Sequence, residues 1–141
     1  MLYEYEATKI GFDNSYDSLT VGFGGKLDTN GHPTRALLLQ RSTDENEDEL
    51  GINGVYVEWN EQINSCYGCI QSIKLARQRI EVVFTEDANL VLDLNVKNEG
   101  LEKKLTELFI SFTLNDNEFQ ELKHNLSNVI FLDCGIFSDL I

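Results

Sequence analysis

The chain has 141 residues, 42% of them hydrophobic, which is the length of one domain with enough apolar residues to bury a core. Its 24 aspartates and glutamates against 11 lysines and arginines give a formal net charge of -13, which opposes binding to nucleic acid or to an anionic membrane surface. The start, MLYEYEATKIG, lacks the leader of a secreted protein, and no apolar run reaches the roughly 18 residues that a membrane span needs. We therefore expect a single domain over residues 1–141 in the cytoplasm, with no nucleic acid or membrane as partner.

Alternating apolar and polar residues predict β-strands through the first two-thirds of the chain. The alternation is clear at residues 3–7, 19–23 and 55–59, and residues 36–39 form a short apolar run typical of a central strand. Residues 73–75 and 80–84 flank a polar RQR segment, which predicts an antiparallel hairpin. Between these strands, DTNGHP at 28–33 and GING at 51–54 carry the Gly and Asn residues typical of turns.

The last third of the chain changes its period. TEDANLV, from Thr85, is consistent with one helical turn, and residues 110–114 predict one more strand. Asn115 and Glu118 then have the spacing of a capping box, and apolar residues recur at helical spacing from Phe119 to Val129. We expect an α+β fold: a single domain, mainly antiparallel β-sheet, with a C-terminal amphipathic helix packed on it.

Three cysteines are too few, and odd in number, for a secreted disulfide scaffold, so we expect free thiols. Cys66 and Cys69 have the spacing of a redox pair, but the segment after them, IQSIKL, alternates as a strand, whereas a redox centre begins a helix. A zinc site needs four ligands, and only Cys134 and two distant histidines remain. The favoured interpretation is structural: small apolar residues around a glycine turn.

The acidic run of residues 44–49 suggests either calcium binding or a contact with a basic partner. Asp44, Asn46 and Asp48 fit the first, third and fifth places of an EF-hand loop, but Glu49 stands where that loop needs Gly. A solvated charged loop is the plainest interpretation, and a binding epitope is the second. Nearby aromatic and charged residues favour the epitope, since such residues form tight protein interfaces.

Catalytic motifs are scarce in this sequence. The two histidines, His32 and His124, have no acid–base spacing, and GFGGK at 22–26 is too short for a phosphate loop, so its glycines are better explained by a strand bend or bulge. We expect no enzyme activity, no cofactor and no bound metal.

Four segments together resemble the immunity protein 10 family, small bacterial cytoplasmic proteins of polymorphic toxin systems. They are ALLLQRS, DENEDELGINGVYVEWNEQ, SCYGCIQSIKL and LFISFTLNDNEFQELKHNL, and they span roughly residues 36–130 in the family's order. The resemblance implies that the protein binds a cognate toxin domain, encoded beside it, and blocks it. It also implies small residues in the turn that holds Cys66 and Cys69 here.

An immunity protein needs fast, charge-steered association with its toxin, and many toxins are nucleases with basic substrate grooves. We therefore expect a basic toxin domain as partner, with candidate toxin-binding residues Asp44, Glu45, Glu47, Asp48, Glu49, Tyr56, Glu58 and Trp59. Trp59 shares an alternating face with Val55 and Val57, which equally suits a core position. The alternative function is an acidic metal- or small-ligand-binding domain without a toxin partner, and the sequence leaves open whether the protein is a homodimer.

Overall fold

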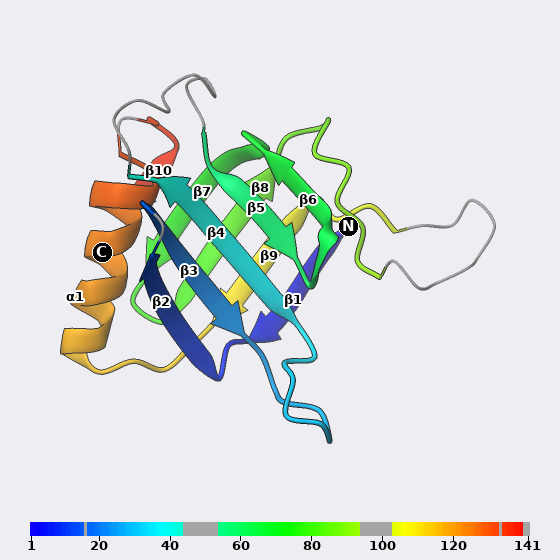
Figure 1. Ribbon diagram of the computed structural model, residues 1–141, viewed down its shortest axis with the longest axis horizontal. Coiled ribbons are helices and arrows are strands. Elements are labelled where there is room, and N and C mark those ends of the chain that lie inside the picture. The colour runs from blue at the N-terminus through cyan, green and yellow to red at the C-terminus, as the bar shows by residue number, and fades with distance from the viewer. Residues whose placement is uncertain (16, 44–53, 94–102, 133, 140–141) are drawn as a thin grey trace.

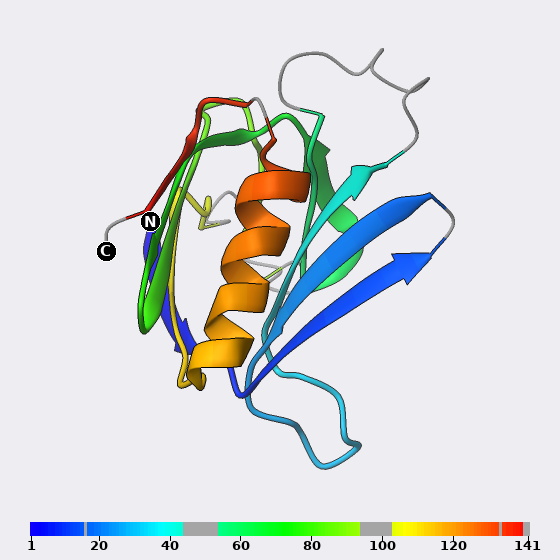
Figure 2. The same ribbon diagram turned by 90° about the vertical axis from the view of Figure 1, so that its left-hand side faces the viewer.

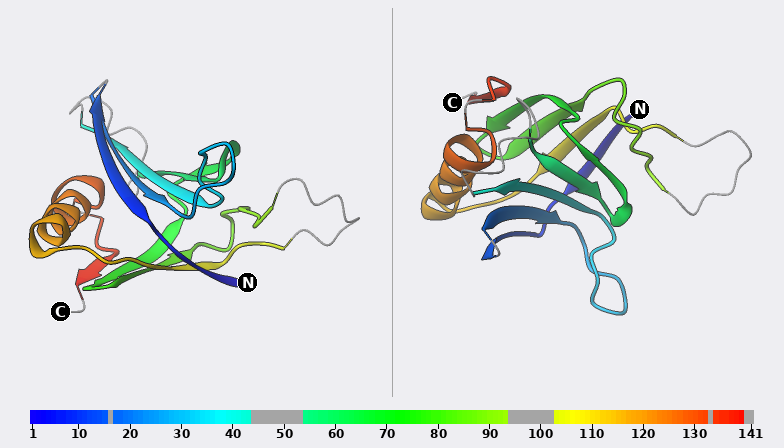
Figure 3. Two further views of the ribbon diagram at one scale, coloured as in Figure 1. Left: turned by 90° about the horizontal axis from the view of Figure 1, so that it is seen from below. Right: turned by 45° about the horizontal axis from the view of Figure 1, so that its top comes forward.

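The computed structural model describes residues 1–15, 17–43, 54–93, 103–132 and 134–139. Two five-stranded sheets pack face to face, and one helical segment lies at an open side between them (Figures 1 and 2). The predicted α+β fold, mainly antiparallel with a C-terminal helix on the sheets, is confirmed. Figure 3 shows the helix from two further directions, in each case beside the sheets rather than in front of them.

The first sheet, here sheet A, has the order β1-β9-β8-β7-β10. Its strands are β1 (Leu2–Glu6), β9 (Glu107–Ser111), β8 (Arg79–Phe84), β7 (Ile70–Ala76) and β10 (Phe137–Asp139). The β7–β8 hairpin around the RQR segment is confirmed. The two edge strands pair in parallel with their neighbours, β1 with β9 and β10 with β7, and neither pairing was predicted from the sequence.

The second sheet, sheet B, is an antiparallel meander in chain order. Its strands are β2 (Lys9–Ser15), β3 (Ser18–Gly24), β4 (Ala36–Ser42), β5 (Tyr56–Trp59) and β6 (Glu61–Tyr67). The apolar run at 36–39 lies in β4, which is the central strand as expected. The register of β3 with both neighbours is unbroken, so the bulge considered for GFGGK is absent. A side chain at Gly25 would instead meet the Tyr5 ring at 3.2 Å and the Arg35 carbonyl at 3.3 Å.

The helical segment consists of α1 (Asp116–Asn125) and one π-helical turn, η2 (Leu126–Ile130). The predicted capping box is present: the Asn115 side chain accepts from the Glu118 amide, and the Glu118 carboxylate accepts from the Asn115 amide. The apolar stripe is buried at Phe119, Leu122, Leu126 and Ile130.

Two details of the last third differ from expectation. Residues 85–88 form a tight turn, in which the Ala88 amide donates to the Thr85 carbonyl, and residues 89–93 are not helical. Strand β9 ends at Ser111, so Phe112 is buried just beyond the strand. In the part of the chain that the structure describes, no helix has the length and apolarity of a membrane span.

The core lies between the two sheets and under the helix. Its large members include Trp59, Phe23 and Phe119. Apolar residues of β3 and β4 in sheet B, and of β7 and β8 in sheet A, have no exposed surface. Arg41 joins the helix to sheet B, because its Nη1 donates to the Ile130 and Leu132 carbonyls at 3.1 and 2.7 Å. Sheet B therefore has one face committed to the core and one left outside.

Candidate partner-binding surface

The outer face of sheet B is covered by no other element of the described chain. Figure 1 looks onto this face, with sheet A behind it and α1 to one side. Because side chains alternate across a strand, the residues between the core positions of β3, β4 and β5 all point outward here. These outward residues determine what the face can bind.

One row of outward residues crosses all five strands of sheet B. Through successive register pairs, the row consists of Asp13, Thr20, Gln40, Tyr56 and Tyr67. Gln40 Nε2 donates to the Thr20 hydroxyl at 3.0 Å, which holds the middle of the row flat. The Tyr56 and Tyr67 ring centroids are 5.0 Å apart, and Tyr67 is 59% exposed. The row therefore presents a supported, accessible aromatic pair at one end.

Glu58 fixes the orientation of Tyr56. The Tyr56 hydroxyl donates to Glu58 Oε1 at 2.9 Å. Partial burial raises the pKa of the Tyr56 phenol, and the hydrogen bond to the Glu58 carboxylate raises that pKa as well. The phenol is therefore a neutral donor at physiological pH, and the carboxylate keeps free lone pairs toward solvent. A basic partner group would find a carboxylate already oriented beside two aromatic rings.

A second row lies beside the first and is nearly flat. It consists of Gly11, Gly22, Leu38, Glu58 and Ser65. The Leu38 side chain covers Gly22 so closely that an added Cβ at Gly22 would lie 3.0 Å from Leu38 Cδ2. Leu38 thus forms a low apolar ridge between the glycines and the tyrosines.

We call the central part of this surface the tyrosine face, formed by Thr20, Leu38, Gln40, Tyr56, Glu58 and Tyr67. Only one of these six side chains is charged, and two are tyrosines. Protein interfaces are typically depleted of charge at their centre and enriched in tyrosine. The tyrosine face has that composition.

The outer face of sheet A has the opposite character. Its outward positions include Glu4, Glu6, Lys74, Arg79, Glu81 and Glu107. Arg79 forms an ion pair with Glu81 at 2.9 Å and covers the Phe109 ring at 5.0 Å, so its charge and the one aromatic ring are already engaged. This composition is typical of a solvated face.

A family model described as Immunity protein 10 matches residues 6–120. The chain belongs to the immunity protein 10 family. No curated protein and no solved structure matches the chain. The matched residues include every strand of sheet B, and hence the whole tyrosine face, together with the β7–β9 part of sheet A and the start of α1.

The residues predicted to bind toxin fall into three groups in this immunity protein: the acidic residues 44–49, the pair Tyr56 and Glu58, and Trp59. Asp44, Glu45, Glu47, Asp48 and Glu49 lie outside the described residues. Tyr56 and Glu58 form the outward pair of β5, as the alternation predicted. Sequence reasoning overlooked Tyr67, Leu38 and Gln40, although their positions between core residues, or next to the glycine turn, were a usable signal for outward orientation.

Trp59 belongs to the core, in agreement with the second of the two positions considered for it. Its side chain has no exposed surface, and Nε1 donates to the Leu92 carbonyl at 3.1 Å. The Tyr3 and Tyr5 rings lie 6.0 and 5.6 Å from the indole. In this structure the Trp59 side chain is not accessible to a partner. It packs on the core side of β5 and holds the strand in place through the buried aromatic cluster.

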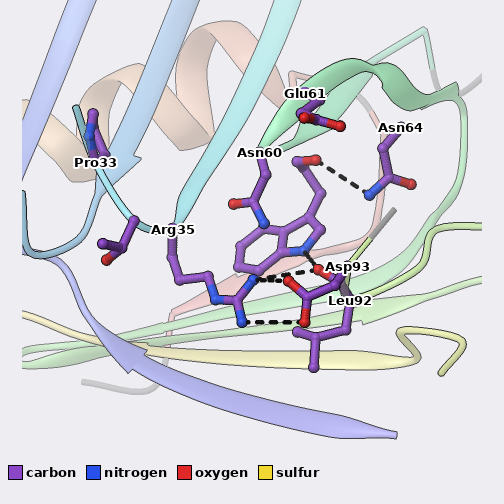
Figure 4. Close-up of a pocket in the computed structure, with 9 residues that line it drawn as sticks. Pro33, Arg35, Asn60, Glu61, Asn64, Leu92 and Asp93 are labelled. Carbon is purple, nitrogen blue, oxygen red and sulfur yellow. Dashed lines mark hydrogen bonds and ion pairs between the residues drawn. The ribbon is translucent and has the colours of Figure 1, made fainter. Parts of the chain in front are cut away.

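A polar cavity of about 250 Å³ lies at the edge of this aromatic cluster (Figure 4). Arg35 crosses it, with Nη1 2.6 Å from Asp93 Oδ1 and Nε donating to the Tyr3 hydroxyl at 3.0 Å. The hydrogen bond to Asp93 raises the pKa of Arg35, and the guanidinium also lies 4.9 Å from the Tyr3 ring centroid. Because these groups bond one another, we interpret them as structural. Arg35, just before β4, links Tyr3 of β1 to Asp93 in the segment after β8, and we call this set of contacts the brace.

Asn64 completes this brace and is the buried polar side chain of the region. It is 4% exposed, and its Nδ2 donates to the Trp59 and Val91 carbonyls at 3.2 and 2.8 Å. The Val91 amide returns a hydrogen bond to Asn64 Oδ1 at 3.2 Å. The register of β5 and β6 shifts at Glu58 and Trp59, and Asn64 bonds the Trp59 carbonyl at this shift while it also ties β6 to Val91, in the segment after β8.

The cysteines correct one expectation and support another. Cys66 and Cys69 form a disulfide, so the expectation of free thiols is wrong for this pair. The glycine turn itself is present, since Gly68 has φ +63° and the strand β7 follows directly, with no helix. The two Cα atoms lie 6.1 Å apart across this turn, a separation that the sequence spacing alone did not reveal. Cys134 is buried elsewhere, against Arg41.

In the described part of the chain, no three side chains among His, Cys, Asp and Glu converge on one point where they could hold a metal ion. His32 lies in the exposed loop after β3, and His124 is exposed on α1, both as the sequence suggested.

Proposed function

We propose that this immunity protein binds a cognate toxin domain through the tyrosine face and neutralises it by direct contact. The observation that carries the proposal is the contrast between the two outer faces. The face of sheet B is aromatic and poor in charge, whereas that of sheet A is covered by charged side chains. Buried tyrosines at the centre of an interface contribute most of the affinity, while charges at its rim mainly accelerate association.

The acidic cluster Asp44, Glu45, Glu47, Asp48 and Glu49 complements this face as a steering element. It belongs to the connection between β4 and β5, and Gln40 and Tyr56, the last register pair before that connection, are both members of the tyrosine face. A toxin with a basic groove, such as a nuclease, would be attracted by a chain of net charge -13 and then held by the tyrosines. We propose that the cluster sets the association rate and that Tyr56, Glu58 and Tyr67 set the dissociation rate.

The proposal is tested by co-expressing the protein with the C-terminal domain of the large protein encoded beside it. Cell survival and a co-purifying complex are expected. Tyr56→Ala combined with Tyr67→Ala should weaken the complex at least about a hundredfold, the effect of losing hot-spot aromatics. Phe109→Ala is the matched control, because Phe109 is an outward aromatic residue on sheet A.

Two results would contradict the proposal. If the neighbouring domain is not toxic, or no complex forms, the protein reverts to an acidic domain that binds another ligand. If the complex forms but the control weakens it as much as the tyrosine variant does, the toxin binds a different face.

A further inference from the structure

Strand β2 leaves one complete edge of sheet B open. It is the terminal strand of the sheet, seven residues long, and its register with β3 runs without interruption from Lys9 to Ser15. Among the described residues, no strand pairs with its outer side, and the element nearest to it on that side of the molecule is α1, which lies between the two sheets (Figures 1 and 2). A long, regular edge strand is a template for pairing with another chain, and proteins usually protect such edges with bulges, prolines or repeated charges. Strand β2 has neither a bulge nor a proline, and its two charged residues, Lys9 and Asp13, are of opposite sign.

The direction of its unpaired backbone groups follows from the hydrogen bonds of β3. The Gly25 amide donates to the Arg35 carbonyl at 2.8 Å and the Thr43 amide to the Asp17 carbonyl at 2.7 Å, so odd-numbered residues of β3 bond toward β4. Even-numbered residues of β3 therefore bond toward β2, because the two directions alternate along a strand. Their register partners in β2 are odd-numbered. The amides and carbonyls of Ile10, Phe12 and Asn14 consequently point to the open edge.

We propose that β2 pairs antiparallel with β2 of a second copy of this chain, about a two-fold axis at Gly11. The sequence of the strand is self-complementary in this register. Lys9 of one copy lies opposite Asp13 of the other, and Ile10 lies opposite Phe12. Both kinds of pair occur twice, and opposite-charge pairs and apolar cross-strand pairs each stabilise an antiparallel ladder. The resulting interface is isologous, as in most homodimers, because each copy contributes the same strand.

The hydrogen-bond directions select the same register. Ile10 and Phe12 both point to the open edge, so they form the hydrogen-bonded pairs, while Lys9 and Asp13 form a non-hydrogen-bonded pair with closer side chains. Sliding one strand by two residues places Lys9 opposite Ser15 or Gly11, and either change loses both ion pairs. Sliding by one residue brings outward-bonding residues opposite inward-bonding ones. One register therefore satisfies backbone, charge and apolar side chains together.

The isolated chain leaves these groups available. Among the described residues, neither Lys9 nor Asp13 takes part in an ion pair, and the two lie four positions apart along the strand, about 13 Å, too far to pair with each other. Ile10 and Phe12 pack against the core and are partly buried, so part of each side chain remains accessible. Gly11 has nothing within 4 Å of where a Cβ would be, so its backbone can be approached closely at the axis. The strand is locally neutral although the chain carries -13 overall.

Dimerisation through β2 would affect how the proposed toxin-binding surface is presented, but the dimer proposal does not depend on toxin binding. Pairing at β2 joins the two sheets B into one continuous ten-stranded sheet, with two tyrosine faces on the same side. The dimer would hence be able to hold two partner molecules at once. Dimerisation itself is measured without any toxin, so failure of one proposal is distinguishable from failure of the other.

The test uses sedimentation velocity on the full chain at about 0.15 M salt, over roughly 1 to 200 μM protein. The unmodified chain is expected to dimerise in this range. Lys9→Glu and Asp13→Lys each place like charges opposite each other twice, so each should weaken dimerisation at least about tenfold. An equimolar mixture of the two variants restores opposite charges at every pair and should form a heterodimer of unmodified affinity.

A second measurement locates the axis. Gly11→Cys places two thiols across a non-hydrogen-bonded pair, so mild oxidation should give a covalent dimer, whereas Ser15→Cys, on the same face of β2, should not. A chain that stays monomeric at 200 μM overturns the proposal. Dimers that persist unchanged in both charge variants overturn it too, and so does a mixture that fails to associate. Circular dichroism of each variant confirms that its fold is retained.

Discussion

Replacing Asn64 by Leu tests how much the buried amide contributes to stability. This amide joins β6 to Trp59 at the end of β5 and to Val91, behind the tyrosine face. The substitution keeps the number and branching of the side-chain heavy atoms but leaves the Trp59 carbonyl, the Val91 carbonyl and the Val91 amide without their side-chain partner. At about 1 kcal/mol for each hydrogen bond, the free energy of unfolding should fall by about 3 kcal/mol. For a chain of this length, that loss corresponds to a fall of about 10 °C in Tm.

The measurement is urea unfolding followed by tryptophan fluorescence, since the single tryptophan, Trp59, is one of the affected partners. Gln62→Leu is the matched control: it makes the same kind of change two residues away on β6, where the side chain is exposed, and should alter stability by less than about 0.5 kcal/mol. If the free energy of unfolding falls by less than about 1 kcal/mol for Asn64→Leu, or by the same amount in the control, these three hydrogen bonds do not stabilise the fold as we infer.

Three further predictions concern stability and protection. Asn115→Ala removes the capping box of α1 and should cost about 1 kcal/mol in thermal or urea unfolding, and an unchanged stability would show that packing alone holds the helix start. Reducing the Cys66–Cys69 disulfide should lower the free energy of unfolding by about 2 kcal/mol, as expected for so short a loop, and Cys66→Ser with Cys69→Ser should remove this sensitivity to reductant while still protecting cells from the toxin. Loss of protection in that well-folded variant would give the cysteines a functional role. Burial raises the pKa of Tyr5 in the folded state, so the folded chain keeps its proton when the unfolded chain has lost it, and stability should be full below about pH 10 and decline above it. In Tyr5→Phe, which loses the hydrogen bond to the Phe23 carbonyl, this part of the alkaline decline should disappear, and an identical alkaline profile would refute the assignment.

The sequence by itself determined those features that depend on neighbours along the chain. The capping box of Asn115 and Glu118, the β7–β8 hairpin and the alternation of β5 all arise from interactions over a few residues, and each is present as predicted. The alternation also separated Tyr56 and Glu58, as the outward pair, from Val57 and Trp59.

Only the tertiary structure decided how the strands divide into two sheets, because that choice depends on contacts between residues far apart in the chain. The parallel pairing of β1 with β9 joins residues more than a hundred positions apart, and no local pattern encodes it. The same holds for the burial of Trp59 beneath Tyr3 and Tyr5. The Cys66–Cys69 disulfide spans only three positions, but the sequence predicted free thiols there, and the geometry of the turn, with Gly68 at φ +63°, brings the two cysteines together. The tyrosine face exists because the helix and sheet A both lie on the other side of sheet B, and that arrangement is a property of the packed core rather than of any segment.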